Sequence, residues 1–291
     1  MINLGWSQLF SSFRLHAAVE ASAGKLRVLS ARKSRRKGMD SVVSVEGPSG
    51  GITRGTITHL GDAVESLSEA IAEAERRSGA SFRSVSLNLT SDSLEMLRVT
   101  GMRILRGEGE ITAQDVRAVC AGAMRQAVHF EKKVIYWNPV RFVVDEQDEV
   151  ENPIGVFGRK LEAEILVLLT PAMLVESWRR AALRCHLDPV RFVPRAWSLV
   201  CGSLSESPGM GKRVVVDADA DFLTLVVCRR GGIEDLLIVN SPEDRTRPAD
   251  SRVEAFLERH RDTELLPLSM QSQLLPDSQH DGFFYALLRK T

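Results

Sequence analysis

The chain has 291 residues, and its 38 lysines and arginines balance its 38 aspartates and glutamates. This balance leaves no global field that would favour nucleic acid or an anionic membrane surface, and the length suits two or three modest folding units. The four cysteines are isolated along the sequence. They indicate reduced thiols in a cytoplasmic protein, with neither a disulfide framework nor a zinc site.

No segment is expected to enter a membrane. The first 19 residues lack a continuous apolar core, so no signal peptide is expected. The most apolar stretch, residues 165–174, is too short to span a bilayer.

The first third of the chain predicts strands followed by one helix. Residues 1–31 indicate three short strands, with turns near residues 11–12 and at Ala23-Gly24. Residues 32–38 form a basic loop, for which a solvated hairpin is favoured over a contact with nucleic acid or lipid. An apolar stripe predicts a helix over residues 62–78 that ends at Gly79 as its C-cap and buries Val64, Leu67, Ile71 and Ala74.

The middle of the chain predicts a separate α+β unit. Strands near residues 84–89 and 96–105 are expected to open it, and strands near 133–144 and 161–169 to close it. Between them, Thr112 and Asp115 form a capping box for a helix over residues 113–128. That helix is expected to bury Val116, Val119, Cys120, Ala123 and Ala127.

The last third predicts a helix, a strand meander and two further helices. Thr170-Pro171 has the composition of an N-cap and first helical residue for a helix over residues 171–186. Strands over 213–217, 222–228 and 233–239 form the meander. A linker over 241–251, a helix over 251–261 and a short helix over 281–289 follow. A meander at each end of the chain indicates a coarse internal repeat.

One loop carries the most specific signature. Phe142 and Val144 alternate as in a strand, and an acidic turn, Asn152-Pro153 and two glycines follow them. This stretch resembles the return loop of the inserted SHS2-type (1C) subdomain of FtsA, an actin-like bacterial cell-division protein. The matching residues are Asp145, Pro153, Gly155, Gly158, Leu161 and Glu162. Residues 51–57, 109–116 and 276–288 resemble further FtsA segments in the same order; the first of these is a strand in that family.

The resemblance implies an α/β fold: a reduced actin-like (ribonuclease H-like) core with an inserted SHS2-type α+β subdomain. Residues 1–81 would be the first part of subdomain 1A, residues 82–169 the inserted subdomain, and residues 170–291 the rest of 1A with a truncated 2A meander and a closing helix. Subdomain 2B is expected to be absent. The basic C-terminal helix that docks such proteins on membranes is also expected to be missing.

The resemblance further implies two turns that would hold nucleotide phosphates. Asn3, Gly5 and Ser7 occupy vestigial positions in the first turn, and Asp217, Asp219 and Asp221 occupy the second, where the family has glycines. Each added carboxylate would repel a phosphate charge by roughly 3 kcal/mol at about 5 Å and an effective dielectric of about 20. Metal ligation by the three aspartates is the competing interpretation, but a plain acidic turn is favoured over it. No cofactor, no metal and no enzymatic activity are therefore expected.

These inferences predict a non-catalytic FtsA-like adaptor or scaffold in bacterial cell division. It would act through protein contacts of the inserted subdomain, for which the candidates are Arg103, Glu108, Glu110, Arg117 and Arg159. A solvated face is an equal alternative for these residues. The expected partners are division proteins, including a full-length FtsA, with no nucleic acid and no direct membrane insertion. The chain would be cytoplasmic and recruited to the division site at the inner face of the membrane. Two alternatives are an actin-like protein with a rebuilt ATP site and a PilM-like pilus-assembly adaptor.

Overall fold

The computed structural model describes residues 15–34, 38–146, 149–188, 191–206, 211–229, 232–240 and 251–265. The described chain divides into two compact units. The inserted unit is Glu95–Ala172, and the core unit joins the described residues of Phe13–Leu94 to those of Met173–Thr291. Within these ranges no helix is long and apolar enough to cross a membrane.

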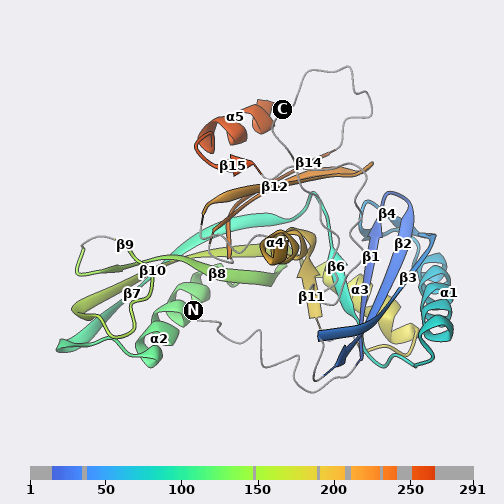
Figure 1. The fold of residues 1–291 in the computed structure, drawn as a ribbon, viewed down its shortest axis with the longest axis horizontal. Helices are drawn as coiled ribbons and strands as arrows, with labels where there is room; N and C mark the ends of the chain where they lie inside the picture. Colours follow the sequence, from blue (N-terminus) through green and yellow to red (C-terminus); the bar gives the residue numbers. More distant parts are fainter. Residues whose placement is uncertain are drawn as a thin grey trace. The chain divides into compact units, whose positions relative to one another are not determined.

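The first sheet of the core unit has five strands in the order β11-β6-β1-β2-β3 (Figure 1). An antiparallel meander forms one side: β1 (Leu15–Ser22), β2 (Lys25–Ser34) and β3 (Gly38–Pro48). Parallel strands β6 (Ser86–Leu89) and β11 (Arg191–Pro194) extend it beyond β1. Ala23 and Gly24 join β1 to β2 with φ of 53° and 72°, which suits a tight hairpin and confirms the turn expected there.

Two helices pack on this sheet through one apolar cluster. Helix α1 (Leu60–Ser78) contributes Leu67 and Ile71, and α3 (Ala172–Arg184) contributes Leu174 and Trp178. As expected, α1 ends at Gly79, whose φ of 65° is the left-handed conformation of a glycine C-cap. A further helix, α4 (Arg195–Glu206), begins directly after β11 and contacts strands of both sheets of the core unit.

The second sheet of the core unit repeats the order of the first. Strands β12 (Arg213–Ala218), β13 (Phe222–Arg229) and β14 (Gly232–Asn240) form an antiparallel meander, and β15 (Glu264–Leu265) pairs in parallel with β12. The resulting order is β14-β13-β12-β15. The meander and the coarse repeat were both expected from the sequence.

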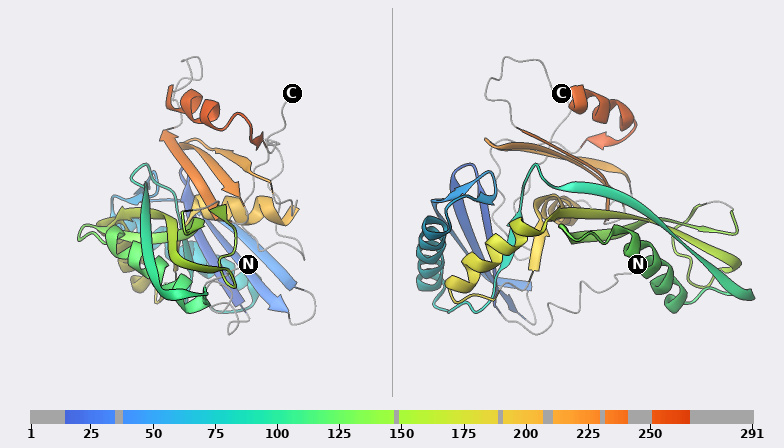
Figure 2. Two further views of the ribbon diagram at one scale, coloured as in Figure 1. Left: turned by 90° about the vertical axis from the view of Figure 1, so that its left-hand side faces the viewer. Right: turned by 180° about the vertical axis from the view of Figure 1, so that it is seen from behind.

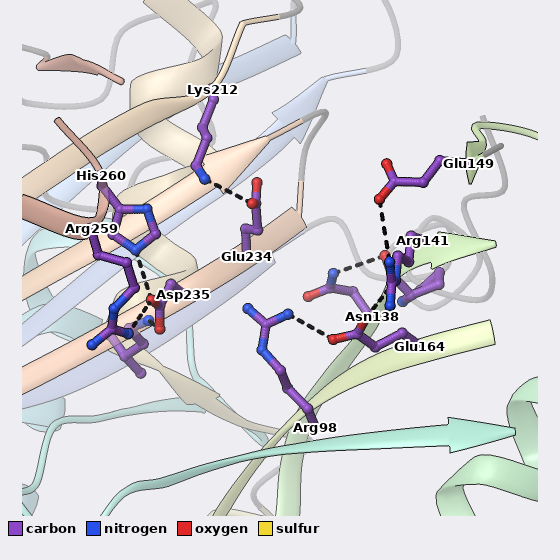
Figure 3. A network of polar contacts seen from close by, with 12 residues as sticks. Arg98, Asn138, Arg141, Glu149, Glu164, Lys212, Glu234, Asp235, Arg259 and His260 are labelled. Carbon is purple, nitrogen blue, oxygen red and sulfur yellow. Dashed lines mark hydrogen bonds and ion pairs between the residues drawn. The ribbon is translucent and has the colours of Figure 1, made fainter. Parts of the chain in front are cut away.

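Helix α5 (Ser251–Arg259) is fastened to this second sheet by both apolar and polar contacts. Its Phe256 is buried in the apolar cluster of the sheet. The His260 Nε2 atom lies 2.7 Å from the Asp235 Oδ2 atom, and Arg259 Nη1 lies 3.2 Å from the same oxygen (Figure 3). The contact between His260 and Asp235 is therefore buried beside Phe256, and it fixes one end of the helix.

The inserted unit is a four-stranded antiparallel sheet with one helix on a single face (Figure 2). Its strands are β7 (Glu95–Glu110), β8 (Lys132–Val144), β9 (Glu149–Val150) and β10 (Phe157–Pro171), in the order β7-β10-β8-β9. Helix α2 (Ala113–Met124) continues as a 3-10 turn, η1 (Arg125–Ala127). The expected stripe of α2 is buried, and burial raises the pKa of the Cys120 thiol to about 11.

The glycine-containing loop of this unit is built by local geometry. The carboxylate of Asp145 accepts the N–H groups of Arg159 and Lys160 at 2.8 and 2.7 Å. Gly155 has a φ of 89°, which favours glycine. At Gly158, a Cβ atom would lie 2.4 Å from the Val144 Cγ1 atom. The glycines are therefore required by the chain path.

Four sequence predictions are wrong in detail. The first meander is not confined to residues 1–31, because β2 continues to Ser34, inside the expected loop over 32–38, and the third strand is β3 (Gly38–Pro48). The strand near residues 84–89 does not open the inserted unit, because β6 pairs with β1 and β11 in the core sheet. Thr170 and Pro171 do not cap a helix, since both still pair with β8 and α3 begins at Ala172. Residues 51–57 form the small hairpin of β4 (Ile52–Thr53) and β5 (Thr56–Ile57) instead of one strand. The turn at residues 11–12 and the helix over 281–289 lie outside the described residues.

Candidate functional site

Two hairpin turns meet in the core unit, one from each sheet. The Ser22 hydroxyl donates to the Asp219 Oδ2 atom at 2.5 Å, and the Ala23 N–H donates to the Asp221 Oδ2 atom at 2.7 Å. Asp219 also shapes its own turn, because its Oδ1 atom accepts the N–H groups of Asp221 and Phe222 at 2.8 and 2.7 Å. The β1–β2 turn and the β12–β13 turn are thus joined by direct hydrogen bonds.

Arg195, the first residue of α4, lies at the centre of this junction. Its Nε atom is 2.6 Å from the Asp217 Oδ2 atom, and its Nη1 atom is 2.7 Å from the Asp219 Oδ2 atom. The same Nη1 atom donates to the Ser22 hydroxyl at 3.0 Å and lies 3.4 Å from the Glu20 Oε1 atom. With a side chain only 8% exposed, the guanidinium is a buried counterion for carboxylates from both sheets.

Glu20 also takes part in a short series of hydrogen bonds between polar side chains. The Asn88 side chain donates to Glu20 Oε1 at 3.1 Å, and the Ser198 hydroxyl donates to the Asn88 Oδ1 atom at 3.1 Å. The second carboxylate oxygen of Glu20, Oε2, is buried and has no hydrogen-bond partner among the residues that the structure describes.

The cluster contains more acidic groups than Arg195 can balance. Burial raises the pKa of Glu20 and of Asp217, although Arg195 opposes the shift in both cases. Burial acts in the same direction on Asp219, but Arg195, the Ser22 hydroxyl and the backbone N–H groups outweigh it and lower the pKa of that carboxyl. For Arg195, burial is outweighed by the three carboxylates, so its pKa is raised. Asp219 is accordingly the carboxylate that holds its charge most firmly.

An exposed arginine also contacts the β12–β13 turn. Arg54, in the β4–β5 turn, donates through Nη2 to the Asp221 carbonyl oxygen at 3.2 Å, and its guanidinium lies 5.2 Å from the centre of the Phe222 ring. The second turn is therefore contacted by residues from three separate segments of the core unit.

The acidic turn lies where the sequence predicted it, and its charged partner is Arg195, which the sequence did not indicate. Asp217, Asp219 and Asp221 lie at the β12–β13 connection as expected, and the first two pair with Arg195. Asn3, Gly5 and Ser7 lie outside the described residues. No group of three or more His, Cys, Asp or Glu side chains in the described ranges is arranged to hold a metal ion.

Sequence reasoning missed Glu20, Ser22 and Arg195. The turn expected at Ala23-Gly24 could have identified the first two, because it joins the first two strands of a meander and has the same place in its sheet as the β12–β13 turn. Nothing in the sequence around Arg195 marks it, although three neighbouring carboxylates imply that a buried cation is needed.

The candidate contact residues of the inserted unit occupy one end of its sheet and its helix. Arg103, Glu108 and Glu110 lie on β7, Arg117 on α2 and Arg159 on β10. The Arg103 Nε atom forms an ion pair with the Asp115 Oδ1 atom at 2.9 Å. Glu110 is paired in register with the first residue of β10.

Exposed apolar side chains accompany these charges and were not expected from the sequence. Met102 and Ile104 of β7 are 60% and 73% exposed, and Phe157 of β10 is 71% exposed. In the register of the sheet, Met102 lies opposite Glu162 and Ile104 opposite Lys160. This end of the sheet therefore combines apolar and charged side chains.

Comparisons with known proteins agree with this architecture. Residues 92–169 match the family described as the SHS2 domain inserted in FtsA. Cell division protein FtsA of Enterococcus hirae is 28% identical over 184 residues, which cover 62% of this chain and 39% of that protein. FtsA of Streptococcus pneumoniae is 25% identical over 237 residues, which cover 81% of this chain and 51% of that protein. The chain spans about half, or less, of the length of these relatives.

A solved structure of the PilM-PilN type IV pilus biogenesis complex has the same fold. It superposes with a TM-score of 0.53 at 16% identity and covers 77% of this chain and 61% of that chain. The two sheets of repeated strand order form an actin-like core. In the sequence, the SHS2 domain follows β6 and precedes α3. The chain therefore resembles FtsA in sequence and combines an actin-like core with the SHS2 domain that is inserted in FtsA.

Proposed function

We propose that this protein is a non-catalytic adaptor in bacterial cell division and acts through protein contacts of its inserted unit. The observation that supports this most is the occupied junction between the two turns, where Arg195 is already paired with Asp217 and Asp219. A nucleotide phosphate entering there would have to displace the guanidinium and approach buried carboxylates. Both steps are costly in a site of low dielectric.

The surface of the inserted unit supports the adaptor part of the proposal. Met102 and Ile104 expose apolar area next to Glu162 and Lys160, and Phe157 does so next to Glu110. Apolar side chains surrounded by charged ones are typical of a protein-protein contact. The partners proposed for this surface are other division proteins, including a full-length FtsA whose polymer end the protein could cap.

Nucleotide binding provides the first test. At 1 mM Mg-ATP, we expect the melting temperature of the purified protein to stay within about 1 °C of its value without nucleotide. A ligand at 100 times its Kd would add about 2.7 kcal/mol and raise the melting temperature by several degrees. Such a rise in the wild-type protein would contradict the proposal and favour an ATP-binding protein with a rebuilt site. A nucleotide-binding FtsA serves as the positive control.

Binding to a full-length FtsA polymer provides the second test. We expect the protein to sediment only together with that polymer, and the double variant M102D/I104D to lose most of this binding. The matched control is M173D/L183D, which places the same charges on exposed apolar positions of α3 in the core unit. Equal binding by the two double variants would remove the inserted unit from the proposal.

A pilus-assembly adaptor remains the second candidate, because the PilM-PilN structure has the same fold. At 16% identity that likeness concerns the fold alone. A two-hybrid screen that offers both FtsA and a PilN-like protein separates the two. Binding to the PilN-like protein alone would favour the pilus assignment.

A further inference from the structure

The hydrogen bonds between the two turns connect the two sheets of the core unit. Ser22 ends the first strand of one sheet and Ala23 begins the turn after it, whereas Asp219 and Asp221 connect the first two strands of the other sheet. The Ser22 to Asp219 and Ala23 to Asp221 bonds therefore run from sheet to sheet. Separating the sheets at this point would break both of them.

The Arg195 guanidinium reaches both sheets at once. On the second sheet it meets Asp217 at 2.6 Å and Asp219 at 2.7 Å, and on the first it meets the Ser22 hydroxyl at 3.0 Å. A planar guanidinium can make several such contacts simultaneously, which an ammonium group cannot do with the same geometry. The charged partners have side chains no more than 14% exposed, so solvent screens these contacts weakly.

Charge makes the guanidinium essential to the junction. Without it, Glu20, Asp217 and Asp219 would be buried together without their central cation. Removing one partner of a buried ion cluster is strongly destabilising because the remaining charges stay uncompensated. The carboxylates would then repel one another across the junction and favour its opening.

We propose that Arg195 is a built-in clasp that holds the β1–β2 turn against the β12–β13 turn, so that the two sheets keep one arrangement without a bound ligand. The proposal rests on the proposed function, because a core that binds no nucleotide needs an internal link between its sheets. In this arrangement the guanidinium occupies the place between the two turns that a bound ligand would otherwise fill.

Hydrogen exchange of the full-length protein tests the clasp at the amides of Ala23, Asp221 and Phe222. All three amides donate to carboxylates of the junction. The variant Arg195→Lys keeps the positive charge but loses the planar, forked set of N–H donors. In this variant we expect the three amides to exchange about tenfold faster than in the wild type, or more. Arg54→Ala is the matched control, because Arg54 contacts the same turn from the exposed side. Wild-type exchange in Arg195→Lys, or equal acceleration in Arg54→Ala, would overturn the proposal.

Chemical rescue provides a second, independent test. In Arg195→Ala, about 10 mM guanidinium chloride should raise the melting temperature relative to the same concentration of sodium chloride, because the ion would bind the vacated site. The wild type and Arg54→Ala should show no such rise. A missing rise in folded Arg195→Ala would contradict the clasp, and if that variant does not fold, the exchange of Arg195→Lys decides. Mg-ATP binding by the wild type would defeat the proposed function while leaving both of these results intact.

Discussion

Glu20 and Asp219 contact the same guanidinium but respond oppositely to pH. Burial raises the pKa of Glu20, and the negative charges of Asp217 and Asp219 raise it further. The positive charges of Arg195 and Arg27 lower it, but they do not outweigh these effects. The folded protein therefore holds a proton on Glu20 more readily than the unfolded chain does, and its stability falls as the pH rises from the ordinary glutamate pKa to the raised one.

We expect Glu20→Gln to remove this loss. The free energy of unfolding of Glu20→Gln minus that of the wild type should increase with pH across this window, by at most about 1.4 kcal/mol per pH unit for one proton. Urea unfolding at several pH values between 4 and 8 measures this difference, with the pH values chosen to bracket the glutamate range. A difference that does not change with pH would contradict the raised pKa.

Asp219→Asn is the matched control for Glu20→Gln, with the opposite sign. The lowered pKa of Asp219 means that its carboxylate stabilises the folded state above the ordinary aspartate pKa, and that this contribution is lost as the pH falls. The variant should therefore be less stable than the wild type at neutral pH, and the gap should narrow in acid. The two substitutions remove one charge each from the same cluster, so their contrast isolates the environment of each carboxyl.

At the scale of elements, the contact between α2 and its sheet depends on Gly101. A Cβ at this position would lie 2.4 Å from the Val119 carbonyl oxygen and 3.0 Å from the Ala123 Cβ atom. We expect Gly101→Ala to lower the free energy of unfolding by roughly 1–3 kcal/mol, because helix and sheet must move apart. Chemical denaturation measures the change.

Gly122→Ala is the internal control for that prediction. Gly122 lies in the same helix, and the nearest atom to an added Cβ is the end of the Arg125 side chain at 3.6 Å. Alanine there should raise the stability by about 1 kcal/mol through helix propensity. Similar effects of the two substitutions would show that α2 does not pack closely at Gly101.

Local signals predicted those elements whose ends are set by neighbouring residues. The capping box of Thr112 and Asp115 and the left-handed Gly79 both act over a few residues, and both are present in the structure. Thr170 and Pro171 have the composition of a helix start, yet the pairing of β10 with β8 continues through them. A tertiary pairing decided this boundary, and the local sequence does not contain that information.

At the scale of the whole molecule, the inserted unit is expected to fold alone. Every fully buried member of its apolar cluster lies between Val99 and Leu169. We expect a fragment of residues 92–172 to unfold in one cooperative transition, with coincident far-UV circular dichroism and tryptophan fluorescence from Trp137. Gly101→Ala in the fragment should lower its midpoint as it does in the whole protein. A broad transition without a folded baseline would contradict this prediction.

The candidate site was predictable only in part. The acidic turn at Asp217 and Asp219 connects two strands that the sequence pattern predicts, so the position of the turn could be predicted as well. Arg195 follows β11, and its role depends on β11 lying beside β6 and on α4 contacting both sheets. Such an arrangement is a property of the whole topology, so no local pattern could indicate it.

The pairing of β6 with β11 has a consequence for biosynthesis. Ser86 lies beside Arg191, so closing this part of the sheet from an unfolded chain must constrain a loop of about a hundred residues. Once the inserted unit is folded, Glu95 and Leu169 are already neighbours. The flexible part shortens to about thirty residues and the entropic cost of closure falls by about 1 kcal/mol. Because chains emerge from the ribosome N-terminus first, the inserted unit is complete before β11 appears, and the insertion itself prepares the closure of the sheet that it interrupts.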